Sequence, residues 1–352
     1  MSKPEAVKIS FWEKVDLPFL QLSVYATMMY AAVTGVFRGK ASPKRYDHYI
    51  VASVVRKLVD RSSSLQAQYA QPGTSDVYTA VMKKRGLDAE TVQLPHDTEG
   101  HWLGNKNAKK VIVYYHGGGF ALPCTPAHVE FWLDMIRALN DNGHDLAVFF
   151  PRYTFTPHAT YPTQLRQAVE ALRYVLSTGR APGDVIIGGD SAGGNLATAT
   201  LLHLTHPHPE IEPVALDAPL AGVFAYAPWV NFSTEWPSMK ENQWKDIITP
   251  SSLKKWSKDY LGGEERDNWN EPLNAPEEWW VDVKTEKMLF LVGSDEILLS
   301  PIEVFANKVK GVFPETTVVV AEDESHDAPF YTMTKEETKS GIELRKWLGS
   351  RL

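Results

Sequence analysis

The feature of the sequence best suited to chemistry is a serine set among small residues. Residues 189–193 read Gly-Asp-Ser-Ala-Gly and fit the pattern G-x-S-x-G, with an apolar run before them and a helical pattern after them. A serine on such a strand-to-helix turn projects its hydroxyl above the sheet, and only small neighbours let the strand and helix approach so closely. The motif predicts Ser191 as a nucleophile, with Gly189 and Gly193 as the small neighbours.

A glycine-rich stretch gives the second chemical signal. His116 is followed by Gly117, Gly118 and Gly119, directly after an apolar run at 111–115. Successive glycines leave backbone N–H groups unshielded, so these groups can donate hydrogen bonds to an oxyanion formed during acyl transfer. We expect His116 to brace the turn through a side-chain hydrogen bond instead of taking part in the chemistry.

A nucleophilic serine needs a histidine that removes its proton. Enzymes with a serine on this kind of turn carry their groups in the chain order serine, acid, histidine. His326 is the one histidine of eleven that follows the apolar run at 288–292. It falls in a loop after the run at 316–320, where a side chain can fold back over the serine. We therefore predict His326 as the base.

The acid that orients this histidine has three candidates. Asp295 is the preferred one, because it lies at the first turn after the run at 288–292. Its neighbour Glu296 is the rival, and Asp323 is a weaker candidate. Asp190, beside the nucleophile, is expected to brace the turn by hydrogen bonds.

Alternating strands and helices must position these groups. Helical patterns separate most of the apolar runs, so the fold class is α/β, with a mostly parallel sheet covered by helices on both faces. We expect strands at 111–115, 146–150, 185–187, 223–226, 288–292 and 316–320, and helices at 49–60, 131–139, 164–176 and 192–203. Residues 62–90 look like an irregular connection. An insertion at 229–285 holds seven of the eleven Trp residues and is expected to form a helical cap.

Composition limits the partners and the location. The net charge of −7 argues against a nucleic-acid partner. The single cysteine, Cys124, cannot form an internal disulfide and is predicted to be a small buried residue. Residues 17–37 carry no charge, and a run of this length fits three interpretations: a helix packed over the active site, a membrane-surface anchor, or a membrane span. If it spans, the basic residues at 38–45 favour a cytoplasmic location for the rest of the chain.

Together, these motifs resemble the hormone-sensitive-lipase-like (group IV) family of α/β-hydrolases. The likeness rests on residues 116–119 and 189–194, on Asp295 and on His326. It implies an α/β-hydrolase fold and the hydrolysis of carboxylic esters without a cofactor or metal. It also implies an oxyanion hole made by the N–H groups of Gly117, Gly118 and Ala192.

The resemblance also implies a division of the chain. A segment at 1–90 would contribute helices to the cap, residues 91–228 and 286–352 would form the catalytic domain, and 229–285 would complete the cap. The sequence departs from the family at Asp327, where a glycine is usual, at 154–158, which lacks Ala-Pro-Glu, and at 296–298, which read Glu-Ile-Leu.

The expected function is therefore a serine esterase or deacylase that acts on an apolar small-molecule or lipid ester through an acyl-enzyme. An acyltransferase or lactone-forming enzyme with the same triad, or a ligand-binding receptor without turnover, are the alternatives. We expect an intracellular location, either cytoplasmic or at the cytoplasmic face of an internal membrane. The oligomeric state stays open.

Overall fold

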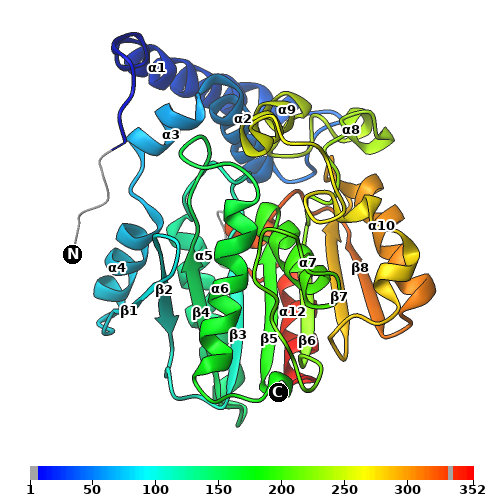
Figure 1. Cartoon of the computed structure of the whole chain (residues 1–352). Coiled ribbons are helices and arrows are strands. Elements are labelled where there is room, and N and C mark those ends of the chain that lie inside the picture. Colours follow the sequence, from blue (N-terminus) through cyan, green and yellow to red (C-terminus); the bar gives the residue numbers. More distant parts are fainter. Residues whose placement is uncertain (1–6, 332–335) are drawn as a thin grey trace.

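The computed structural model describes residues 7–331 and 336–352 and is built around one eight-stranded sheet (Figure 1). The strand order is β1-β2-β4-β3-β5-β6-β7-β8; β2 runs antiparallel to β1 and β4, and all other neighbours are parallel. The strands are β1 Glu90–Leu94, β2 Thr98–Leu103, β3 Lys110–Tyr115, β4 Leu146–Arg152, β5 Val185–Asp190, β6 Gly222–Tyr226, β7 Met288–Gly293 and β8 Thr316–Ala321.

The register places the two chemical motifs side by side. β3 and β5 are parallel neighbours, and Tyr115 pairs with Gly189. The glycine-rich loop that leaves β3 and the turn that leaves β5 therefore begin at the same edge of the sheet. Every residue of β5 and β7 is buried, as expected for central strands of a sheet covered on both faces.

Helices cover both faces of the sheet, and each covered face has its own apolar core. One core joins the sheet to α6, α7 and α10, and the other joins it to α5 and α12. The predicted α/β class with a mostly parallel sheet is confirmed. The helices are α5 Pro126–Asn140, α6 Thr163–Ser177, α7 Ala192–Thr205, α10 Leu299–Val312, α11 Ala328–Tyr331 and α12 Lys339–Gly349, with a short 3-10 turn η2 at Pro182–Asp184.

The region expected to be irregular is folded. Residues 62–90 contain α3 Ser64–Ala70 and α4 Thr74–Arg85, so that expectation is wrong. Ser63 caps α3 by accepting a hydrogen bond from the N–H of Gln66, whose side chain bonds back to the N–H of Ser63. Gly86 ends α4 with φ +69°, a left-handed conformation that suits glycine. These end signals were present in the sequence, but the helices are too short to show a clear apolar period.

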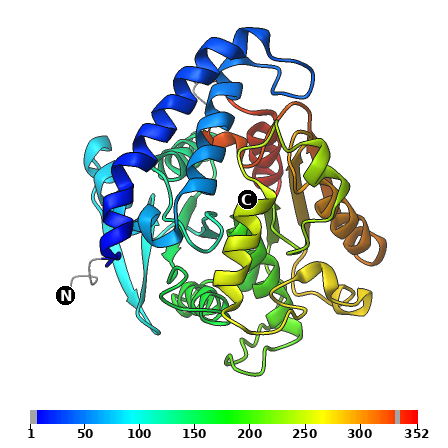
Figure 2. The same ribbon diagram turned by 90° about the horizontal axis from the view of Figure 1, so that it is seen from above.

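A second layer lies above the carboxyl ends of the strands (Figures 1 and 2). Seen from above, α1 and α2 run side by side as a long hairpin, and α9 lies next to α2. The layer contains α1 Phe11–Thr34, η1 Gly35–Phe37, α2 Tyr46–Arg61, α3, α8 Pro237–Glu241 and α9 Pro250–Leu261, and the 3-10 turns η3 Pro272–Asn274 and η4 Glu277–Trp280 complete the 229–285 segment.

The Trp residues of the 229–285 segment serve mainly as packing mass. Trp229, Trp256 and Trp280 are buried, whereas Trp244 is largely exposed. Trp256 lies against Gly119 of the glycine-rich loop, where a Cβ atom would meet the indole ring at 2.5 Å. This indole therefore joins the upper layer to the loop that follows β3.

Candidate active site

Ser191 lies on a strained turn between β5 and α7. Its φ and ψ are +52° and −116°, a region that L-residues rarely adopt. A Cβ at Gly189 would overlap the carbonyl oxygen of Gly193, and one at Gly193 would overlap the carbonyl oxygen of Tyr115. Both positions thus exclude a side chain, which is the physical reason for the small residues in the motif.

His326 and Glu296 complete a hydrogen-bonded chain with this serine. The Nε2 atom of His326 lies 2.8 Å from Oγ of Ser191, and its Nδ1 atom lies 3.0 Å from Oε2 of Glu296. His326 is 2% exposed and Glu296 is fully buried. An imidazole held between a hydroxyl and a carboxylate can take the hydroxyl proton while the carboxylate stabilises the resulting imidazolium.

The prediction that Asp295 orients the histidine is wrong. The Asp295 carboxylate instead accepts a hydrogen bond from Nζ of Lys245 at 2.9 Å. The rival candidate Glu296 holds the histidine, and its other oxygen, Oε1, accepts the N–H of Gly293 at 2.5 Å. Asp323 also lies elsewhere, in an ion pair with Lys44 at the surface.

The geometry of one turn explains this correction. The N–H of Glu296 bonds to the carbonyl of Gly293 at 3.2 Å, while the N–H of Asp295 bonds to the carbonyl of Glu324 at 2.9 Å. The chain thus turns back toward β7 at Glu296, and that side chain points inward beneath His326. Spacing alone could not separate adjacent acids, because each of them falls within the first turn after the strand.

A buried aspartate from the upper layer braces the loops that carry these groups, and sequence reasoning missed it. Asp246 accepts the N–H of His326 at 2.9 Å and the N–H of Ile297 at 2.6 Å. Burial raises the pKa of Asp246 to about 6. Asn242 adds a hydrogen bond from its Nδ2 atom to the carbonyl of Glu296 at 2.8 Å. No signal in the sequence marks either residue, because both lie about fifty residues or more from the groups that they hold.

The glycine-rich loop begins beside the serine turn and has unused donors. Within the part of the chain that the structure describes, the N–H groups of Gly117, Gly118 and Ala192 make no hydrogen bond to another protein group. Gly118 has φ +113°, and Tyr153 donates from its hydroxyl to the carbonyl of His116 at 2.9 Å. The loop is thus fixed from behind, and its donors are available to an oxyanion.

His116 lies behind the loop, as a brace. Its Nε2 atom lies 3.1 Å from Oγ1 of Thr74, and its Nδ1 atom lies 2.7 Å from the carbonyl oxygen of Gly117. Burial lowers the pKa of His116 to about 4, so the ring is neutral at pH 7. Cys124 is also buried, and burial raises the pKa of its thiol to about 12, which makes the thiol unreactive.

Comparison with known proteins places this fold and motif set in a family. The profile of a family described as alpha/beta hydrolase fold matches residues 112–330, more than half of the chain. The chain belongs to the α/β-hydrolase family. The crystal structure of an esterase from the bacterial hormone-sensitive lipase family has the same fold, with a TM-score of 0.66 at 21% identity over 88% of this chain and 99% of that one.

Two characterised relatives of this α/β-hydrolase are similar in sequence. It is 29% identical over 247 residues to steryl acetyl hydrolase 1 of Saccharomyces cerevisiae, a match that covers 64% of this chain and 55% of that protein. It is also 29% identical over 190 residues to an acetyl-hydrolase of Streptomyces hygroscopicus, covering 54% of this chain and 58% of the relative. The chain thus spans little more than half the length of these relatives.

This α/β-hydrolase carries a second carboxylate at its histidine. Asp327 has φ +52° and places Oδ2 3.2 Å from Nε2 of His326, while its Oδ1 atom is buried without a hydrogen-bond partner. Burial alone would lower the pKa of His326, but Asp327, Glu296 and Asp246 outweigh it and raise that pKa. Burial raises the pKa of Asp327 well above its usual value, and the nearby charge of Asp190 adds to this rise.

Asp190 connects the turn that carries Ser191 to β3 and α5. The Tyr114 hydroxyl donates to one of its oxygens, and Nε2 of His128 lies 3.4 Å from the other. Burial opposes charge on Asp190, but His128 and Tyr114 offset it and hold the pKa of this carboxyl below its usual value. Asp190 therefore holds the turn before the serine and makes no contact with the triad histidine within the described ranges.

A small cavity of about 110 Å³ lies beside the glycine-rich loop, Asp190 and Asp327. Its polar wall includes Gly117, Gly118 and Asp327, and its apolar wall includes residues of α2 and the loop after β3. Ser191 is 7% exposed, so this serine lies almost closed off from solvent in this conformation. The apolar lining is Val55, Leu58, Val59, Leu122, Pro123 and Tyr331.

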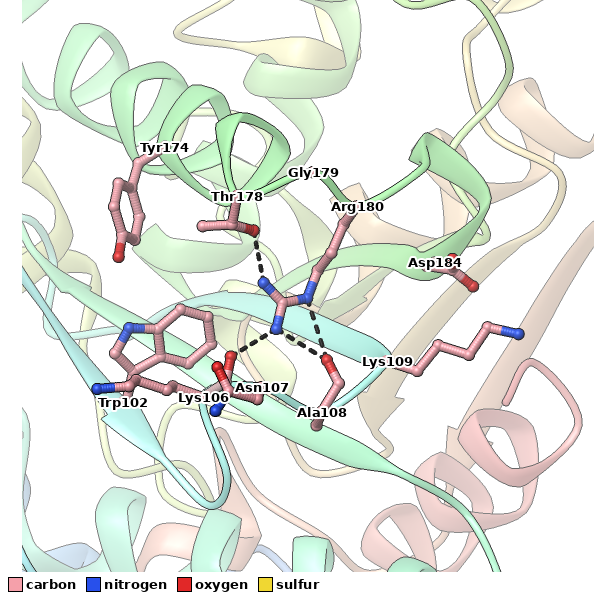
Figure 3. Close-up of a pocket in the computed structure, with 10 residues that line it drawn as sticks. All are labelled: Trp102, Lys106, Asn107, Ala108, Lys109, Tyr174, Thr178, Gly179, Arg180 and Asp184. Carbon is pink, nitrogen blue, oxygen red and sulfur yellow. Dashed lines mark hydrogen bonds between the residues drawn. The ribbon is translucent and has the colours of Figure 1, made fainter.

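A larger hollow of about 440 Å³ lies far from this chemistry, near the amino ends of β3 and β5 (Figure 3). Its central side chain is Arg180, whose guanidinium bonds to the carbonyls of Ala108 and Lys106 and to the hydroxyl of Thr178. This charge is already used to hold the loop before β3. The hollow lies at the opposite end of these strands from Ser191 and shares no lining residue with the cavity beside Gly117.

Proposed function

We propose that this protein is a serine-dependent carboxylic ester hydrolase that works through an acyl-enzyme. The observation that carries the proposal is the continuous chain from Ser191 through His326 to Glu296, 2.8 and 3.0 Å per step, which faces the unused N–H groups of the glycine-rich loop. Its relatives include proteins named acetyl-hydrolases and esterases.

In the proposed reaction, Oγ of Ser191 attacks the ester carbonyl while His326 takes its proton. Glu296 stabilises the imidazolium, and the N–H groups of Gly117, Gly118 and Ala192 bind the oxyanion. The alcohol leaves with the proton from His326, which gives an acyl-serine. A water molecule then attacks this ester with His326 as the base, and the carboxylic acid is released.

We propose an acetyl or similarly short acyl group on an apolar alcohol as the substrate. The cavity beside Gly117 and Gly118 is small and walled on one side by α2, which suits a short acyl group. The yeast relative is named a steryl acetyl hydrolase and the Streptomyces relative an acetyl-hydrolase, which supports an acetyl group on an apolar alcohol. We also propose that the protein associates with a membrane through residues 17–37, because the helical segment Phe11–Phe37 is long and apolar enough to meet a membrane. An intracellular location is part of the same proposal.

The experiment that tests the proposed function is the hydrolysis of p-nitrophenyl esters from acetate to palmitate, with the Ser191→Ala variant beside the wild type. We expect activity on acetate that falls steeply with chain length and disappears in the variant. Full activity of Ser191→Ala would refute the assignment of the nucleophile. Product analysis with added alcohols would separate hydrolysis from acyl transfer.

A further inference from the structure

The exposed face of α1 has the polarity of a buried surface. Twelve of the nineteen exposed large hydrophobic side chains in the described residues lie in α1 and the turn that follows it. They recur at the helical spacing of three or four residues, which makes one continuous stripe. The stripe side chains with more than 60% exposure are Phe11, Trp12, Phe19, Leu22, Tyr25, Met29, Tyr30, Val33, Val36 and Phe37.

The opposite face of α1 holds its polar groups and contacts the protein. Glu13 accepts the Ser63 hydroxyl at 2.8 Å, and Asp16 forms an ion pair with Arg61 near the end of α2. At the other end of α1, the Tyr46 hydroxyl donates to the carbonyl of Ala32 at 2.5 Å. The inner face also buries Leu20 and Ala31, so α1 is apolar on its outer face in addition to its inner one, whereas the outer face of a helix on a water-soluble protein is polar.

We propose that α1 lies in the plane of a lipid bilayer surface, with its stripe in the acyl region and its polar face on the protein. Tyr and Trp are side chains that favour the membrane–water interface, and Trp12, Tyr25 and Tyr30 are all exposed on this helix. Residues 7–45 contain six basic and two acidic residues, a net charge of +4 in a chain of −7. Lys44 and Arg45 pair with acids of the protein, as Asp16 pairs with Arg61, so the apolar stripe and its aromatic side chains carry the proposal and the local charge adds little to it.

The contacts of α1 distinguish this arrangement from a span. A span would pull the helix away from α2 and break contacts at both of its ends, from Asp16–Arg61 to Ala32–Tyr46. Lying flat keeps all of these contacts and buries only the stripe. In Figure 1, α1 forms the outer edge of the upper layer, so no other described element covers the stripe.

The position of α2 connects this surface to the catalytic site. α2 contacts α1 on one side, and its residues Val55, Leu58 and Val59 wall the cavity beside Gly117 on the other. A bilayer that holds α1 therefore lies one helix away from the cavity. An apolar ester dissolved in the bilayer can reach the serine by displacing α2, without crossing bulk water. This last step rests on the proposed function, whereas the binding of α1 does not.

The orientation of α1 can be measured from how deeply a dye attached to each of several positions lies in the bilayer. Val15→Cys, Leu22→Cys and Met29→Cys place single thiols seven residues apart on the stripe, and the native Cys124 is buried. Each variant carries an environment-sensitive dye and is mixed with vesicles of phosphatidylcholine and phosphatidylserine that contain brominated lipids. A helix in the plane gives the same shallow depth at all three positions. A deep maximum at position 22 would show a span and overturn the proposal.

Vesicle binding and activity test the stripe itself. We expect Phe19→Glu with Leu22→Glu to weaken co-flotation by at least about tenfold, which corresponds to about 1.4 kcal/mol. The matched control, Val281→Glu with Val304→Glu, adds the same charges at sites that are about half exposed and far from the stripe. The stripe variant is expected to lose hydrolysis of a long-chain alkyl acetate in vesicles but to keep hydrolysis of p-nitrophenyl acetate in solution.

The outcomes separate this proposal from the proposed function. No co-flotation of the wild type, or equal loss in both double variants, would overturn the surface anchor. A wild-type dimer that the stripe variant alone converts to a monomer, without vesicle binding, would assign the stripe to a second copy and also overturn it. Vesicle binding without hydrolysis of any ester would leave the anchor standing and refute the hydrolase.

Discussion

The choice between two adjacent acids gives the sharpest test of the catalytic geometry. Glu296→Gln and Asp295→Asn are matched changes, because each replaces one carboxylate oxygen with an amide nitrogen. Glu296 is fully buried against Nδ1 of His326, whereas Asp295 contacts the partly exposed Lys245. An amide at position 296 can donate to Nδ1, which turns the imidazole to the wrong tautomer and removes the charge that stabilises its protonated form.

The structure sets the expected magnitudes. Replacing a buried orienting acid in a serine triad by its amide lowers kcat by about 10⁴, and we expect a loss of that order for Glu296→Gln. At about 1.4 kcal/mol per factor of ten, this is about 5 kcal/mol of transition-state stabilisation. Asp295 is buried but pairs with the partly exposed Lys245 and makes no hydrogen bond to the His326 ring among the described residues, so Asp295→Asn is expected to change kcat far less, by about fivefold at most.

Initial rates on p-nitrophenyl acetate measure both variants, and thermal unfolding checks that each remains folded. Glu296→Asp adds a useful control, because it keeps the charge but shortens the reach and should recover part of the rate. Near-normal activity of Glu296→Gln together with inactive, folded Asp295→Asn would refute this geometry and restore Asp295 as the acid.

Three further predictions follow from the groups around the histidine. Asp327 and His326 lie 3.2 Å apart and hold a proton between them, and Asp327→Asn removes the carboxyl of this pair. The pKa of His326 should then fall, and the acidic limb of kcat/KM should move to lower pH, because the base must be neutral; an unshifted pH profile would contradict this coupling. Asp246→Ala leaves the buried N–H groups of Ile297 and His326 without an acceptor. Urea unfolding should show a loss of about 1–3 kcal/mol per unpaired group, and kcat should fall and be partly restored in Asp246→Asn. Gly119→Ala places a Cβ against Trp256 at φ +60° and should both destabilise the protein and slow turnover; a fully active and stable variant would show that the loop position is not fixed by this contact.

The sequence supported those parts of the site that depend on backbone geometry. The turn that carries Ser191 and the glycine-rich loop each need glycine at fixed positions, and such requirements are visible in the sequence as motifs. Gly193, for example, excludes a Cβ because it lies on the carbonyl of Tyr115. The parallel sheet was also predictable, because its central strands are continuous apolar runs.

Groups that depend on three-dimensional contacts could not be predicted in the same way. The choice of Glu296 depends on a hydrogen bond in one turn, and Asp246 acts on His326 across eighty residues. The antiparallel strands β1 and β2 were also missed. Their sequences mix polar with apolar residues, and the outer strand β1 is largely exposed.

The structure distinguishes between interpretations of the uncharged run 17–37 that the composition leaves open. Hydropathy alone allows a packed helix, a surface anchor or a span, because all three need a similar number of apolar residues. The direction of the polar side chains separates them. Glu13 and Asp16 bond to the protein on the same side as the buried Leu20 and Ala31, and the large apolar side chains of the other face, such as Phe19 and Leu22, are exposed.

Helix α2 of the upper layer is connected to the loop that carries His326 through a series of hydrogen bonds. Arg56 of α2 donates from its guanidinium to the carbonyls of Trp244 and Asp246 at 3.1 and 2.5 Å, and the Asp246 side chain accepts the N–H of His326. A displacement of α2 that opens the cavity must therefore strain or break the contacts of Arg56. The helix that walls the cavity beside Gly117 is thus bonded to the segment that holds His326, so we expect a shift of α2 to change the rate of the chemical step as well as the binding of substrate.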